Sequence, residues 1–62
     1  MVFKQVEKII QADGWRLVRI TGSHYQYKKV GYESTVEVPN YNEKNLSAGT
    51  MKNLERITGL SF

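Results

Sequence analysis

The chain contains no cysteine, and histidine occurs only once among its 62 residues. Without cysteine there is no disulfide, no thiolate nucleophile and no cysteine-ligated zinc site. One histidine is too few for a site built from several imidazoles. We therefore expect neither a bound metal ion nor another cofactor.

Long apolar runs are absent as well. No stretch approaches the ~20 apolar residues that a membrane-spanning helix needs. Polar residues interrupt the N-terminal segment where a signal peptide would carry its apolar region, namely Lys4, Gln5, Glu7 and Lys8. The sequence therefore predicts a cytoplasmic protein that has no membrane partner.

Length and charge limit the fold and the partner. A chain of 62 residues predicts one domain, residues 1–62, with a small core, because a domain of this size buries only about 60% of its unfolded surface. Nine Lys and Arg residues against six Asp and Glu residues give a net charge of +3. This excess weakly favours a polyanionic partner such as RNA.

Hydrophobic spacing predicts two helices. Apolar residues recur at helical intervals from Phe3 to Ile10, and Asp13-Gly14 is a typical helix end. A second helix is predicted over residues 49–58, with Ser47 as its N-cap and Gly59 as its C-cap.

Three segments between the helices are predicted to be strands, at residues 15–21, 25–28 and 35–38. The order helix-strand-strand-strand-helix predicts an α+β fold with a three-stranded antiparallel sheet and both helices on one face. Trp15, Tyr25 and Tyr27 are expected in the core, whereas Tyr32 and Tyr41 fall in loops and are candidates for contact with RNA or a partner.

Gly22-Ser23 is a natural two-residue hairpin loop, because glycine tolerates the positive φ of such turns. Strict alternation then predicts these opposed pairs: Thr21 and His24, Ile20 and Tyr25, Arg19 and Gln26, Val18 and Tyr27, Leu17 and Lys28. It places Val18 and Ile20 on the face that packs against the helices. The next hairpin pairs Tyr27 with Val36, Gln26 with Glu37, and Lys28 with Thr35. The open face then carries Arg19, His24, Gln26, Lys28 and Glu37.

The residues of the open face suit acid–base chemistry at His24. Histidine is the side chain whose ordinary pKa, about 6.5, lies closest to neutral pH, so it exchanges protons there. Cleavage of RNA by its own 2′-hydroxyl needs a proton acceptor and cations on the phosphate, and it needs no metal. His24 is the candidate acid or base, Lys28 or Arg19 the phosphate ligand, and Glu37 a second proton-transfer group. The alternative is that these are exposed strand residues without a catalytic role.

A set of short motifs runs along almost the whole chain. They are Asp13-Gly14-Trp15, Arg19-Ile20-Thr21-Gly22-Ser23-His24, Tyr27-Lys28, Thr35-Val36-Glu37-Val38-Pro39, Gly49-Thr50-Met51-Lys52-Asn53-Leu54 and Thr58-Gly59-Leu60-Ser61. In this order and at this length, the chain resembles the HicA-type toxins, the YcfA family of mRNA interferases from HicAB toxin–antitoxin pairs.

The resemblance implies a double-stranded-RNA-binding-domain-like α-β-β-β-α fold and a metal-independent endoribonuclease that cleaves mRNA and arrests growth. It implies that His24 is catalytic, and it places Gly22, Ser23, Lys28 and Arg19 at the RNA. It also implies a HicB-type antitoxin that masks the active surface. Gln26, Glu37 and Tyr41 are possible auxiliary residues.

The chain departs from the family pattern at Tyr41, where many relatives carry a second histidine. A tyrosine there could stack on a base. The second helix also begins with a single lysine, Lys52, so binding of long duplex RNA is not expected. A non-catalytic RNA-binding module, and a degenerate toxin that binds only an antitoxin-like partner, remain alternatives.

Overall fold

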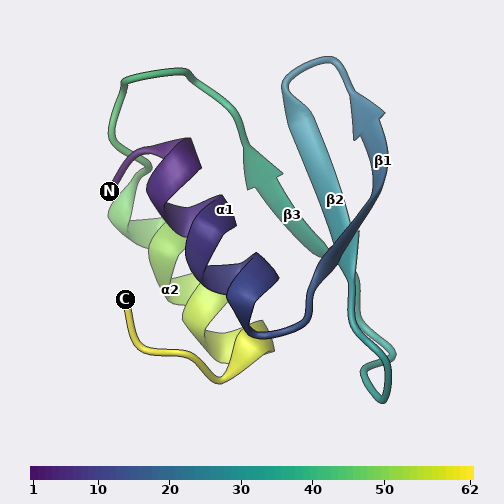
Figure 1. Cartoon of the computed structure of the whole chain (residues 1–62). Helices are drawn as coiled ribbons and strands as arrows, with labels where there is room; N and C mark the ends of the chain where they lie inside the picture. Colours follow the sequence, from purple (N-terminus) through teal and green to yellow (C-terminus); the bar gives the residue numbers. More distant parts are fainter.

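Two helices pack against one side of a three-stranded antiparallel sheet (Figure 1). The computed structural model describes all residues, Met1–Phe62. The elements, in chain order, are α1 (Phe3–Ala12), β1 (Arg16–Thr21), β2 (His24–Lys28), β3 (Val36–Pro39) and α2 (Ala48–Thr58). The strands lie in the order β1-β2-β3, so β2 is the central strand. The α+β fold and the α-β-β-β-α order are confirmed.

Both helices end where the sequence predicts. Gly14 follows α1 with a φ of 102°, and Gly59 follows α2 with a φ of 74°. These left-handed conformations cost glycine little. At the start of α2, the Ser47 hydroxyl accepts a hydrogen bond from the backbone N–H of Thr50 at 3.2 Å. No helix of the chain is long and apolar enough to span a bilayer.

The core lies between the helices and the central and third strands. Val36 and Val38 of β3 and Tyr27 of β2 are fully buried against residues of both helices. The core consists of Phe3, Val6, Ile10, Trp15, Tyr27, Val36, Val38, Leu46 and Leu54. Burial of the Tyr27 ring, followed by a hydrogen bond from its hydroxyl to Glu7, raises the pKa of Tyr27 well above its ordinary value.

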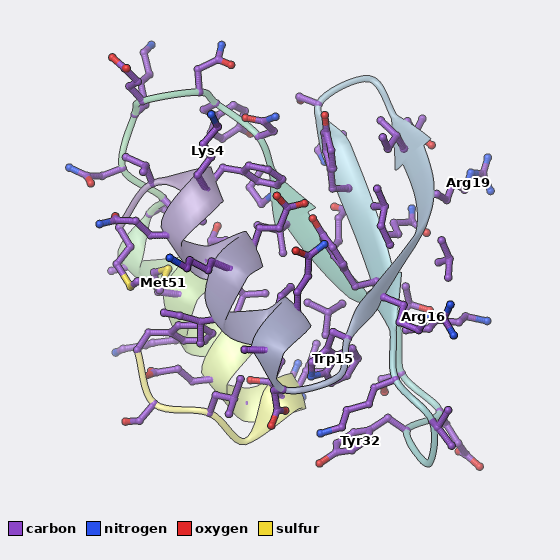
Figure 2. The ribbon with its side chains drawn as sticks, viewed as in Figure 1. Lys4, Trp15, Arg16, Arg19, Tyr32 and Met51 are labelled. Carbon is purple, nitrogen blue, oxygen red and sulfur yellow. The ribbon has the colours of Figure 1, made fainter.

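Trp15 closes the lower end of this core between α1 and the sheet, as predicted (Figure 2). Its ring lies 5.1 Å from the ring of Tyr32 in the loop that follows β2. Lys29 lies over the same tyrosine and pairs with Asp13 at 2.9 Å. Tyr32 therefore belongs to a structural cluster at the end of the sheet opposite to the Gly22-Ser23 turn.

The first hairpin follows the predicted register only near its turn. The pairs Thr21 with His24, Ile20 with Tyr25, and Arg19 with Gln26 are confirmed. The second hairpin pairs Tyr27 with Val36 and Gln26 with Glu37, also as predicted. Its pairing ends there, so the prediction that Lys28 faces Thr35 is wrong: β3 begins at Val36.

Beyond Arg19 the predicted register of the first hairpin is wrong. An irregularity between Leu17 and Arg19 places an extra residue, Val18, in β1. Leu17 therefore lies opposite Tyr27, and Arg16 lies opposite Lys28. Because the two sides of a strand alternate, one inserted residue exchanges the faces of all positions that follow it.

Ile20 and Val18 are not in the core, which corrects a second prediction. Their side chains are 52% and 53% exposed. The helices lie over the β3 side of the sheet, and β1 is the strand farthest from them (Figure 1). Two short helices do not reach across the whole sheet, so all of β1 stays exposed.

Candidate active site on the open face of the sheet

The face of the sheet that points away from the helices is arranged in rows across the strands. The first row contains Thr21, His24 and Pro39, and the second contains Arg19, Gln26 and Glu37. The third row contains Arg16 and Lys28. Directly opposed residues share a face, and successive rows lie about 7 Å apart, because two residues of a strand span that length.

His24 stands at the end of this face and contacts a carboxylate. Its Nδ1 atom lies 3.2 Å from Oε1 of Glu37, and the two side chains are 49% and 52% exposed. The contact is diagonal, from the first row to the second. It leaves Nε2 of His24 without a protein partner, so this nitrogen is accessible to a ligand.

The Gly22-Ser23 turn fixes where His24 lies. Gly22 has a φ of 59° and Ser23 does not share this conformation, a pattern typical of turns that require glycine at the first position. The backbone carbonyl of Ser23 accepts a hydrogen bond of 2.7 Å from the backbone N–H of Asn40, just after β3. The turn is thus bound on both sides, to its own hairpin and to the third strand.

The other predicted site residues lie at graded distances from His24. Gln26 and Arg19 occupy the adjacent row, whereas Lys28 is two rows away, about 14 Å along the strand. Arg19 is therefore the nearest cation to His24 on this face. Tyr41 does not lie on the open face, because it belongs to the loop that leads from β3 toward the helices.

Arg16 is a residue that sequence reasoning missed. The bulge at Val18 brings it opposite Lys28, and Figure 2 shows Arg16 and Arg19 both projecting outward from β1. Strict alternation places residues three apart on opposite faces, so an inserted residue is needed to align these two arginines. The signal in the sequence was the three-residue spacing of these two arginines, with Leu17 and Val18 between them, because a strand with a bulge can place both on one face. The open face consequently carries a cationic strip of Arg16, Arg19 and Lys28.

This arrangement supplies the two requirements of phosphodiester cleavage side by side. An imidazole held by a carboxylate can exchange a proton with a hydroxyl, and guanidinium groups bind phosphate oxygens through paired hydrogen bonds. No group of three or more His, Asp or Glu side chains gathers closely enough to hold a metal ion. The groups present on this face are therefore acid–base and cationic groups.

Comparison with known proteins assigns the family. The family model described as the HicA toxin of bacterial toxin–antitoxin systems matches residues 3–60, nearly the whole chain. No match was found among curated proteins. The matched region contains every element and both faces of the sheet.

Proposed function

We propose that this chain, which belongs to the HicA family of toxins of bacterial toxin–antitoxin systems, is a metal-independent endoribonuclease that uses His24 as its general acid or base. The membership makes the protein a toxin with a cognate antitoxin as partner. Its substrate in this proposal is mRNA in the cytoplasm, and its antitoxin is of the HicB type.

The observation that carries the proposal is the contact between His24 and Glu37. A carboxylate at Nδ1 favours the tautomer in which Nδ1 carries the proton, and this leaves the lone pair of Nε2 free to accept one. The same carboxylate stabilises the imidazolium that forms. Nε2 is also the nitrogen without a protein partner, so the basic atom and the accessible atom are the same.

In the proposed reaction the RNA supplies its own nucleophile. The 2′-hydroxyl loses its proton, its oxygen attacks the adjacent phosphorus, and the bond from phosphorus to the 5′ oxygen breaks. His24 either takes the first proton, while water protonates the leaving 5′ oxygen, or gives a proton to the leaving 5′ oxygen, while water takes the proton of the 2′-hydroxyl. The products are a 2′,3′-cyclic phosphate and a 5′-hydroxyl. The step consumes no water, and it requires no metal ion.

The cationic strip would hold the RNA backbone during this step. Arg19, the cation nearest to His24, is suited to the scissile phosphate, where negative charge grows on the oxygens of the transition state. Lys28 and Arg16 lie farther along and suit the neighbouring phosphates. Gly22 and Ser23 would let the RNA backbone approach closely, since neither residue carries a bulky side chain. Gln26, which lies between Arg19 and Glu37 in the second row, can donate a hydrogen bond to the RNA.

The HicB-type antitoxin would act by covering this same face. The catalytic and RNA-binding side chains proposed for this protein lie on one open surface of the sheet, and no other part of the chain covers that surface. A partner that occupies this surface would exclude RNA and leave the fold unchanged. The toxin would then become active when the antitoxin is lost.

The test is incubation of purified protein with a long mRNA in EDTA, beside His24→Ala and His24→Gln variants prepared in the same way. Removal of a general acid or base costs about 10²- to 10⁴-fold in rate, so the variants should leave the RNA intact. Thermal melts should coincide, because the His24 side chain is half exposed. A variant as active as the parent would refute the role of His24.

A second substrate tests the chemistry. An oligonucleotide in which one 2′-hydroxyl at the cleaved position is replaced by hydrogen should resist cleavage there, because the nucleophile is absent. Cleavage at the modified position would exclude attack by the 2′-oxygen. If RNA stays intact with the parent and a gel shift shows binding, the non-catalytic RNA-binding module is the better assignment.

A further inference from the structure

A groove lies beside the candidate active site, on the helix side of the sheet. It is formed by the first turns of α1, by Tyr25 of β2 and by residues 40–44 after β3. Its volume of about 950 Å³ lies at the upper end of the range typical of ligand pockets, roughly 300–1,000 Å³. A smaller hollow is lined by the same loop. Figure 2 shows Lys4 of α1 at this end of the molecule.

The groove begins where the His24 site ends. Pro39 lies opposite His24, and the next residue, Asn40, both lines the groove and binds the carbonyl of Ser23 at 2.7 Å. In Figure 1 the β1–β2 turn and the connection from β3 to α2 occupy the same end of the molecule. The groove and the His24 site therefore meet at the Gly22-Ser23 turn and Asn40, so RNA that lies over His24 can continue past this end of the sheet toward the groove.

The charges of the groove suit a neutral ligand better than a phosphate. Lys4 and Lys44 are balanced by Glu7 and Glu43 in the same lining. The open face, by contrast, carries cations in a strip. Phosphate groups would accordingly stay on the open face, and the groove would receive the part of a nucleotide that has no charge.

Tyr41 and its neighbours suit a nucleobase. Tyr41 is 48% exposed, and no other aromatic ring packs against it. The Oδ1 atom of Asn40 accepts the backbone N–H of Asn42 at 3.0 Å, and Asn42 has a φ of 59°. This tight turn holds Tyr41 at its tip. The side-chain amide of Asn42 stays free of protein partners, and an amide can pair with the donors and acceptors of a base edge.

We propose that this groove is a nucleobase subsite, in which Tyr41 stacks on the base of the nucleotide next to the cleaved bond and Asn42 reads its edge. The inference rests on the proposed function in one respect, because it assumes that single-stranded RNA lies over His24. Stacking on an aromatic side chain is a common way to bind single-stranded nucleic acid. Here it would set which base precedes or follows the cut.

The test measures binding alone, so that it does not depend on cleavage. The probe is a mixed-sequence 2′-O-methyl RNA oligonucleotide, which lacks the nucleophile, and the readout is fluorescence anisotropy over a series of salt concentrations. Loss of one stacked base weakens binding by about 5- to 150-fold. We expect this loss for Tyr41→Ala and near-parental affinity for Tyr41→Phe, which keeps the ring.

The slope of log K against log salt separates a base contact from a phosphate contact. Tyr41→Ala should leave the slope unchanged, because no charge is removed, whereas Lys28→Ala should reduce it by about one counterion. The matched control is Tyr32→Ala, a tyrosine of similar exposure at the opposite end of the sheet. Its affinity should equal that of the parent, with a melt to confirm that the protein is folded.

Abasic substitutions give the decisive comparison. One abasic position in the oligonucleotide should weaken binding to the parent, because the base that stacks on Tyr41 is missing. The same substitution should have no effect on binding to Tyr41→Ala, because this variant has no ring on which the base could stack. Equal affinities of the parent and Tyr41→Ala would overturn the proposal, as would a loss in Tyr41→Phe equal to that in Tyr41→Ala. A Tyr41→Ala effect confined to binding of the antitoxin would also overturn it. Tyr41-dependent binding without any cleavage of mRNA would support the subsite and refute the nuclease.

Discussion

Replacing Glu37 with glutamine tests what the carboxylate beside His24 does. Glutamine keeps the size of the side chain and removes its charge. The two side chains of the pair are 49% and 52% exposed, and exposed ion pairs contribute about 0.2–1 kcal/mol. Because each 1.36 kcal/mol corresponds to a factor of ten in rate, an orienting carboxylate should change the rate of cleavage by about 1.5- to 5-fold.

A carboxylate that transfers a proton itself would behave differently. Removal of a general acid or base lowers the rate by about 10²- to 10⁴-fold. The two roles of Glu37 are therefore separated by at least a factor of twenty. The structure favours the smaller effect, because Glu37 contacts Nδ1 of His24 at 3.2 Å and water reaches both groups.

The assay is single-turnover cleavage in EDTA with protein in saturating excess, so that the rate reports chemistry and not binding. Saturation matters because loss of a negative charge should strengthen RNA binding. The effect of Glu37→Gln should shrink as salt is added, since salt screens exposed pairs. The control is Glu33→Gln, which removes the same charge from an exposed position in the loop after β2.

Three outcomes would refute this reasoning. A loss above 100-fold would mean that Glu37 is itself an acid or base. A rate equal to that of the parent at low salt would mean that the contact with His24 has no influence on the reaction. An equal loss in Glu33→Gln would mean that the change reflects net charge and not the position of Glu37.

The remaining predictions concern the fold. Gly22→Val should lower the free energy of unfolding by about 1–3 kcal/mol, because a β-branched residue resists the φ of 59° that the turn requires; an unchanged melting temperature would show that this conformation is not needed. Ile20→Lys should change stability by no more than about 0.5 kcal/mol, since the side chain is 52% exposed, while Val38→Ala should cost about 2 kcal/mol, since Val38 is fully buried. Similar denaturant midpoints for these two variants would contradict the placement of the core.

The position of His24 could be predicted because it depends on short-range geometry. A two-residue turn fixes the pairs nearest to it, and the confirmed pairs from Thr21 to Arg19 lie within that range. The helix ends could be predicted for a similar reason. Gly14 and Gly59 adopt the left-handed conformations that end a helix, and this preference belongs to the residue itself.

Other features depend on parts of the chain that no local pattern connects. Alternation read from the turn cannot reveal a bulge at Val18, and the face of every earlier residue in β1 depends on it. The groove could not be predicted from a local pattern either. It exists because Val2 forms a bridge with Asn45 and the carbonyl of Met1 accepts the N–H of Leu46 at 2.8 Å, so that the start of the chain lies beside residues 40–44.

Strand β1 contributes cations to the open face and no side chain to the core. All of its residues are exposed, so the strand contributes no side chain to the core, while fixing the backbone of each residue costs about 1–2 kcal/mol. Pairing with β2 offsets part of this cost, yet a chain of 62 residues has little stability to spare. What β1 does add is Arg16 and Arg19, aligned on the open face by the bulge at Val18 and carried beside His24. In the proposed function, β1 therefore serves mainly to carry these two cations, and Arg16→Ala and Arg19→Ala should weaken RNA binding without changing the core.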